Sequence, residues 1–195
     1  IPPNISTPLF TRLTEQQQQT LQSVRNALLT SDTQKQRNSK RTRPILIEGD
    51  AGSGKTVIAA TLFHHLKHDP LFAGRKIGLV YANPATRKEL QSVFRCVPGK
   101  DQKEILCPVA VTKEHYDIII CDEAQRLRRN QNLGMYTPHF LRGNARLGLG
   151  AGCDELDWLL TNSDDQVFLY DEKQIANPAD IPAEQFRARL EVEQG

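Results

Sequence analysis

Short continuous apolar runs alternate with segments whose apolar residues recur at helical spacing over most of this chain. The continuous runs are typical of strands buried on both faces, and they lie at residues 44–48, 76–83, 115–123 and 166–172. The segments with helical spacing lie at residues 57–66, 84–95, 154–160 and 181–193. Strands that alternate with helices predict an α/β fold with a mainly parallel sheet and helices on both of its faces.

Three further segments do not follow this alternation. Residues 15–29 have leucine and valine at helical spacing after Thr14, a plausible cap, and this pattern predicts an N-terminal helix. Residues 31–43 contain five basic side chains and no large apolar one, which favours a solvated linker over a phosphate-contacting arm. Residues 127–152 are rich in glycine, asparagine and arginine and predict a long loop, which in a compact domain is usually functional or mobile.

Length and composition are those of one domain. We divide the 195 residues into an N-terminal helix with a basic linker (1–43) and an α/β lobe (44–195). Hydrophobic residues make up 38% and the net charge is +2, so net charge gives no argument for a nucleic-acid partner. We predict no membrane partner, because no apolar run is long enough to span a bilayer. The chain begins with Ile rather than Met, which suggests an excerpt of a longer protein.

The spacing of the four cysteines does not indicate a metal site or a redox pair. They are Cys96, Cys107, Cys121 and Cys153, and no two of them form a CxxC pair. Cys121 lies inside a predicted buried strand, so buried reduced thiols are favoured over disulfides or a zinc site. Reduced thiols favour a cytoplasmic location.

The strongest motif is GDAGSGKT at residues 49–56, a full GxxxxGK[ST] match between a predicted strand and a predicted helix. Glycines let the backbone direct its N–H groups at phosphate oxygens, and the helix that follows adds the positive end of its dipole. Lys55 is expected to reach the β- and γ-phosphates of ATP, and Thr56 to offer its hydroxyl to Mg²⁺. The residues assigned to the nucleotide are Gly49, Ala51, Gly52, Ser53, Gly54, Lys55 and Thr56.

A second motif, ICDEAQRL, begins in the buried run near residue 120 and contains two adjacent acids where that run ends. Ligands of open α/β sheets sit at the carboxyl ends of the strands, which places both acids near the phosphate loop. Asp122 is expected to hold Mg²⁺ through water. Glu123 suits a base that polarises the attacking water, and this second carboxylate favours hydrolysis over phosphoryl transfer to a small substrate.

A third motif, VFLYDEKQ, repeats the arrangement of a buried strand that ends in an acid, here at residues 167–174. Asp171 is expected near the metal-bound water. Gln174, three residues later, is expected to touch the γ-phosphate. The alternative is a strand followed by an ordinary polar turn.

In this order, GDAGSGKT, ICDEAQRL and LYDEKQ resemble motifs I, II and III of superfamily 1 helicases. With the tail DEKQIANPADI, the chain is most similar to the Schlafen group 3-like helicase domain over roughly residues 13–185. The resemblance implies a three-layer RecA-like P-loop NTPase fold. LTEQQQQTL resembles the adenine-reading segment and implies that Gln17, or Gln16 in the alternative register, contacts the base. YANPATRKEL resembles a segment that touches the nucleic-acid backbone, with candidates Asn83, Thr86 and Arg87.

The resemblance implies the ATP-binding lobe of a DNA/RNA helicase or translocase that couples ATP hydrolysis to single-stranded nucleic acid. Helicases of this superfamily split ATP between two RecA-like lobes, and the chain resembles the first lobe only. We therefore expect weak or no hydrolysis by this lobe alone. The alternative is an ATP-dependent switch that recruits a protein without translocation. Tyr170 stands where many such helicases carry glycine. Five arginines either grip phosphates, face the second lobe or are simply solvated, namely Arg126, Arg128, Arg129, Arg142 and Arg146.

Overall fold

The computed structural model describes residues 13–38, 43–95, 101–131, 134–175 and 177–192. The helices are α1 (Glu15–Asn38), α2 (Lys55–His68), α3 (Pro84–Arg95), α4 (Pro108–Val111), α5 (Thr137–Leu147), α6 (Glu155–Thr161) and α7 (Ala183–Val192). The strands are β1 (Ile45–Glu48), β2 (Ile77–Tyr81), β3 (Ile105–Leu106), β4 (Tyr116–Asp122) and β5 (Ser163–Tyr170). Short 3₁₀ turns follow two strands, η4 (Ala124–Arg126) after β4 and η6 (Glu172–Gln174) after β5.

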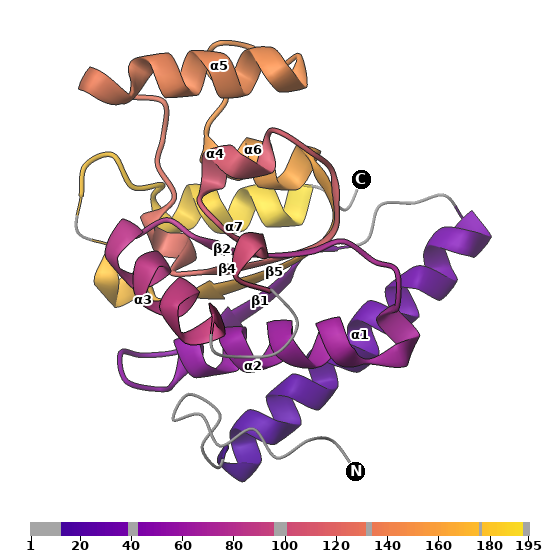
Figure 1. Cartoon of the computed structure of the whole chain (residues 1–195). Coiled ribbons are helices and arrows are strands. Elements are labelled where there is room, and N and C mark those ends of the chain that lie inside the picture. The colour runs from indigo at the N-terminus through magenta and orange to yellow at the C-terminus, as the bar shows by residue number, and fades with distance from the viewer. Residues whose placement is uncertain (1–12, 39–42, 96–100, 132–133, 176, 193–195) are drawn as a thin grey trace.

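The five described strands form one sheet in the order β1-β5-β4-β2-β3, and every pair is parallel. Helices α1, α2 and α3 lie on one side of this sheet, and α4, α5, α6 and α7 lie on the other (Figure 1). The expected three-layer α/β fold with a parallel sheet is thus confirmed. Parallel strands place all their carboxyl ends at one edge, and this edge collects the residues after β1, β2, β4 and β5.

Each face of the sheet has its own apolar core. On one face, α1 and α2 contribute buried residues that pack on Ile118 and Ile120 of β4 and on Val167 of β5. On the other face, α6 and α7 pack on Ile119 and Phe168. Successive residues of β4 and β5 therefore enter opposite cores, as the period of two in a strand requires. The continuous apolar runs arise because both faces are covered.

Two predicted loops are helical instead. The N-terminal helix does not end at residue 29, and α1 continues to Asn38 through the first half of the predicted linker. The predicted loop 127–152 contains α5, which packs on α6 through Phe140 and Trp158, whose ring centroids lie 4.9 Å apart. The ring of Trp158 lies 2.6 Å from the position that a Cβ on Gly143 would take, and its indole N–H donates to the side-chain oxygen of Asn144 at 2.5 Å. Trp158, which is 1% exposed, is therefore a core residue.

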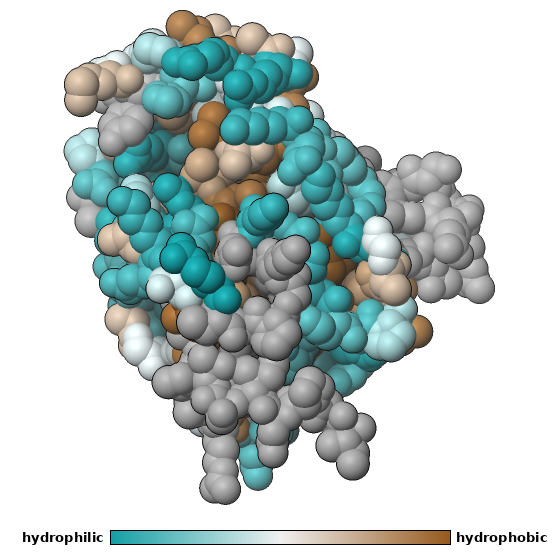
Figure 2. Space-filling view, viewed as in Figure 1, coloured by the Kyte–Doolittle hydropathy of each residue, from teal (hydrophilic) through white to brown (hydrophobic). Residues whose placement is uncertain are grey.

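The outer layer formed by α5 stands furthest from the sheet. Figure 1 shows α5 above α4 and α6. In Figure 2 the side of this region that faces the viewer is mainly hydrophilic, its upper edge includes hydrophobic residues, and more hydrophobic residues lie between it and the layer below. Met135 and Leu141, just before and within α5, are exposed apolar side chains. Among the described helices, none combines the length and the apolar composition needed to cross a bilayer.

Candidate active site

The phosphate loop connects β1 to α2 at the carboxyl edge of the sheet. Gly52 and Gly54 have φ values of 80° and 82°, which side-chain-bearing residues rarely adopt. A Cβ on Gly54 would also overlap the side-chain nitrogen of Gln17. Helix α2 begins directly after this turn, at Lys55, so its N-terminus faces the space that the loop encloses.

Lys55 is held by the loop itself and by the third motif. Its ammonium donates to the carbonyls of Gly49 at 2.5 Å and Asp50 at 2.7 Å, and it lies 3.2 Å from Oδ2 of Asp171. The ammonium is thus satisfied from three sides by oxygen atoms. Phosphate oxygens of a nucleotide would have to replace these partners.

Asp122 is buried at the end of β4, beside the hydroxyls of Thr56 and Tyr81. It is 1% exposed, and neither of its carboxylate oxygens makes a hydrogen bond with the described residues. Burial raises the pKa of Asp122, and the nearby hydroxyls of Thr56 and Tyr81 oppose that rise. The hydroxyl of Tyr81 is itself buried without a hydrogen bond to the described residues. Buried polar groups are normally paired, so this cluster fits a hydrated cation that would complete its bonds.

Glu123 combines burial with backbone strain. It is the one non-glycine residue with positive φ (51°) among the described residues, and it stands between β4 and η4. Strain of this kind is commonly retained where function requires it. Burial, and then the Asp122 charge, raise the pKa of Glu123, while Arg126 opposes the rise. A carboxyl with a raised pKa, and with one oxygen that no described residue bonds, suits a base.

The third motif is joined to the other two by direct contacts. Asp171 is 2% exposed and pairs with Lys55 across 3.2 Å. Its backbone N–H donates to the side-chain carbonyl of the buried Gln125 at 3.1 Å. Gln174 ends η6, and its N–H donates to the carbonyl of Asp171 at 3.1 Å. The structure thus brings the predicted residues of all three motifs to one edge, and adds Gln125, which ICDEAQRL contained but the sequence analysis did not assign.

The predicted adenine contact also lies at this edge. The side-chain amide of Gln17 donates to the carbonyl of Ser53 at 3.3 Å, so the start of α1 touches the phosphate loop. The same side chain accepts a bond from the N–H of Thr14 at 3.0 Å, which fixes it at the helix start. The candidates for the nucleic-acid backbone lie further along the edge, after β2, where Asn83 accepts from the N–H of Ala85 at 3.0 Å and begins α3.

Arginines after the second motif are held against the segment that precedes α7. Arg126 pairs with the buried Asp180 at 3.7 Å, and Arg129 donates to the carbonyl of Pro178. The backbone N–H of Arg129 donates to the carbonyl of Ala179 at 2.7 Å, so the two segments lie bonded side by side. This ordered contact replaces the loose loop predicted here.

The histidines of α2 and the cysteines do not form a metal site within the described residues. The rings of His64 and His68 lie 4.2 Å apart, but no group of three potential ligands occurs in that part of the chain. Burial, with the neighbouring His68, lowers the pKa of His64 to about 4. Cys107, Cys121 and Cys153 are free thiols, while Cys96 lies outside the described residues.

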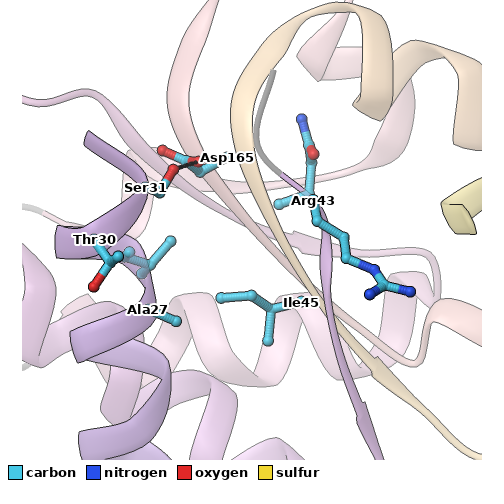
Figure 3. A pocket seen from close by; sticks show the side chains of 8 residues that line it. Ala27, Thr30, Ser31, Arg43, Ile45 and Asp165 are labelled. Atoms are coloured by element: carbon cyan, nitrogen blue, oxygen red, sulfur yellow. Dashed lines mark hydrogen bonds between the residues drawn. The ribbon is translucent and has the colours of Figure 1, made fainter. Parts of the chain in front are cut away.

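A separate pocket of about 280 Å³ lies near the amino ends of β1 and β5, where Ile45 and Asp165 line it together with α1 (Figure 3). The Ser31 hydroxyl donates to the buried Asp165 there at 2.6 Å. Amino and carboxyl ends of parallel strands lie at opposite edges, so this pocket is distinct from the candidate active site.

Comparison with known proteins assigns the family. The family model of the Schlafen group 3, DNA/RNA helicase domain matches residues 42–192, and the chain therefore belongs to this family. A search of curated proteins found no match.

Two solved structures were also compared. AMPPCP-bound DnaA from Aquifex aeolicus is 14% identical with a TM-score of 0.43, over 95% of this chain and 49% of that chain. A structure of Pif1 helicases that coordinate DNA unwinding at forked double-stranded DNA is 15% identical with a TM-score of 0.38, over 93% of this chain and 38% of that chain. The chain therefore spans half or less of the length of each.

Proposed function

We propose that this chain is the ATP-binding lobe of a superfamily 1-like helicase or translocase, in which ATP hydrolysis is coupled to binding of single-stranded DNA or RNA. The observation that carries the proposal is the buried carboxylate of Asp122, unpaired among the described residues, beside a complete phosphate loop. Membership of the helicase-domain family supports the same conclusion. The proposed cellular location is the cytoplasm.

The phosphate loop binds the nucleotide through charge and backbone geometry. Backbone N–H groups of residues 49–56, assisted by the start of α2, donate to the phosphates. Lys55 exchanges its carbonyl partners for phosphate oxygens, which is favourable because a phosphate carries a full charge. Gln17, whose side-chain amide donates to the carbonyl of Ser53 in the loop, is assigned to the base.

The carboxylates divide the remaining work. Thr56 and Asp122 would hold Mg²⁺, whose charge offsets the negative charge of the phosphates. Glu123 accepts a hydrogen bond from the attacking water and orients it, which its available oxygen and raised pKa favour. Gln174 is assigned to the γ-phosphate, and Asp171 supports Lys55 and the water near the metal site.

Nucleic acid is proposed to bind near the start of α3. Asn83, Thr86 and Arg87 follow β2 and so share an edge with the nucleotide residues. A second RecA-like lobe is the proposed partner that closes the nucleotide site. The contacts of Gln125 and Arg126 join the second motif to the third and to the α7 side, so a change at the phosphates can alter this whole edge.

Isothermal titration of the chain with Mg-ATP tests the proposal. Lys55→Ala is expected to weaken binding at least about 100-fold, because it removes a charge-assisted contact to two phosphates. Lys113→Ala is the matched control, since Lys113 is an exposed lysine just before β4, at the opposite edge of the sheet. Equal affinities of wild type and Lys55→Ala would refute the assignment.

A further inference from the structure

The phosphate loop contains an acidic residue that the functions assigned above leave unused. Asp50 is the single acid in GDAGSGKT and follows Gly49. Its Oδ1 atom lies 2.8 Å from the ammonium of Lys173 in η6. Both side chains are largely exposed, 72% for Asp50 and 74% for Lys173. Each group shifts the pKa of the other in the direction that favours the charged pair.

A nucleotide would make this pair unfavourable. Triphosphate bound by the loop would put several negative charges beside the carboxylate of Asp50, and like charges repel. An ion pair between two exposed side chains is weak, so it opposes this exchange only weakly. Phosphate oxygens carry more charge than one carboxylate and are the stronger partner for an ammonium group.

The orientation of the loop indicates which phosphate lies near Asp50. Gln17, assigned to the base, touches the loop at Ser53 and packs against Gly54. Asp50 lies at the other end of the loop, where it meets η6 and the third motif. The nucleotide therefore runs from the base beside Gln17 towards its last phosphate beside Asp50.

The backbone at Lys173 is held in place by its neighbours. A move of the Lys173 ammonium therefore requires only a rotation of its exposed side chain. Its N–H donates to Oδ1 of Asp171 at 3.1 Å. The preceding Glu172 is engaged by Arg187 of α7 at 2.8 Å. Because Glu172 is already paired, Lys173 has Asp50 as its described ionic partner.

We propose that Lys173 is a terminal-phosphate contact: its ammonium leaves Asp50 when ATP binds and pairs with the γ-phosphate. The ion pair between Asp50 and Lys173 joins the phosphate loop to η6, and binding of ATP breaks it. ADP lacks the phosphate that Lys173 reaches, so the residue makes the site prefer ATP over ADP. This inference rests on the proposed nucleotide site and adds a residue that discriminates between nucleotides.

The test measures the Kd of Mg-ATP and of Mg-ADP by titration for wild type, Lys173→Ala and Lys113→Ala. Lys173→Ala is expected to weaken ATP binding by about tenfold or more, as for loss of a charge-assisted hydrogen bond, and to leave ADP binding within about twofold. Lys113→Ala should change neither constant. An unchanged ATP affinity, or equal weakening of ATP and ADP, would overturn the role of Lys173.

A second variant separates a phosphate contact from a purely structural pair. Asp50→Asn removes the repulsive charge and frees Lys173, so ATP affinity should rise at least about twofold with ADP affected less. If Asp50→Asn instead weakens ATP binding as much as Lys173→Ala, the pair only shapes the loop and the inference fails. If wild type binds neither nucleotide, the proposed function itself fails, an outcome distinct from ATP binding that is insensitive to Lys173.

Discussion

At the residue scale, the carboxylate of Asp122, which is proposed to hold Mg²⁺, is also expected to reduce the stability of the fold. It is buried at the end of β4 with neither oxygen hydrogen-bonded to the described residues. An unpaired buried charge is unfavourable, and burial raises the pKa of Asp122 for the same reason. Because this pKa is raised on folding, the folded protein binds the proton of the Asp122 carboxyl more tightly than the unfolded chain does. The contribution of Asp122 to the free energy of unfolding therefore falls as pH rises from about 4 through the raised pKa.

Asp122→Asn is therefore expected to stabilise the chain at pH 7 when no nucleotide is added. The gain in the free energy of unfolding should be about 1 kcal/mol or more, and it should disappear as pH falls below about 4, where the carboxyl is protonated in both states. Thermal unfolding between about pH 4 and pH 8 measures it. Asp164→Asn, at an exposed position in β5, is the control and should shift Tm little. A lower Tm for Asp122→Asn at pH 7 would contradict this account.

The same variant should lose the effect of Mg²⁺ on ATP binding. Asn is a weaker ligand for a hydrated divalent cation than a carboxylate, so adding Mg²⁺ should improve ATP affinity far less than in wild type. Glu123→Gln should keep this Mg²⁺ effect, because Glu123 is assigned to the water. Titrations with ATP at several Mg²⁺ concentrations measure both. Equal Mg²⁺ dependence of Asp122→Asn and wild type would place the metal elsewhere.

Residues within motifs were predictable, and contacts between motifs were not. Lys55, Asp122 and Asp171 follow from local patterns of strand, glycine and acid, and the structure brings them to one edge. The bond from Asp171 to Gln125 depends on β4 and β5 being neighbours, which no local pattern specifies. The Lys173 contact arises in the same way. The roles of these residues in chemistry stay predictions.

At the scale of elements, helix α5 is the main feature that the composition of residues 127–152 did not predict. Glycine and asparagine in residues 127–152 predict turns, yet Gly143 and Asn144 are the residues that let α5 approach Trp158. Both are tertiary effects: Gly143 allows close helix contact, and the buried amide of Asn144 bonds an indole. Helix propensities of single residues do not include such effects. Strands β1, β2, β4 and β5 and helices α2, α3, α6 and α7 were predictable because their apolar residues repeat with the period of the element. The two-residue strand β3 and the four-residue helix α4 were missed, since neither is long enough to show a period.

Gly143→Ala tests this packing. The added methyl would stand 2.6 Å from the ring of Trp158, so either α5 or the ring must shift. Overpacking of this kind destabilises by about 1–3 kcal/mol, and a lower Tm is expected. Gly152→Ala is the matched control, because no described atom lies within 4 Å of the position that its methyl group would occupy and its φ is not positive. Equal Tm values for the two variants would show that α5 does not depend on this contact.

At the scale of the whole molecule, the proposed hydrolysis of ATP requires a group that stabilises the charge of the transition state. Transfer of a phosphoryl group develops charge that an arginine commonly stabilises, a contribution on the order of 10³ or more in rate. Arg126 is paired with Asp180. Arg187 is paired with Glu48 and Glu172. Each arginine would have to break these ion pairs before it could stabilise the transition state. The ammonium of Lys173 is a single point charge and a weaker substitute than a planar guanidinium.

Residues 1–195 alone are therefore expected to bind Mg-ATP and to hydrolyse it at least about 10³-fold more slowly than the typical rate of roughly 1–100 s⁻¹ of enzymes that transfer phosphoryl groups. Steady-state phosphate release at saturating ATP measures this rate, with Glu123→Gln as the background. Adding single-stranded DNA or RNA should raise the rate little, because nucleic acid supplies no arginine. Turnover in the typical range, abolished by Glu123→Gln, would contradict the prediction. It would mean that the contacts joining the three motifs already assemble a complete active site, with no need for a second lobe.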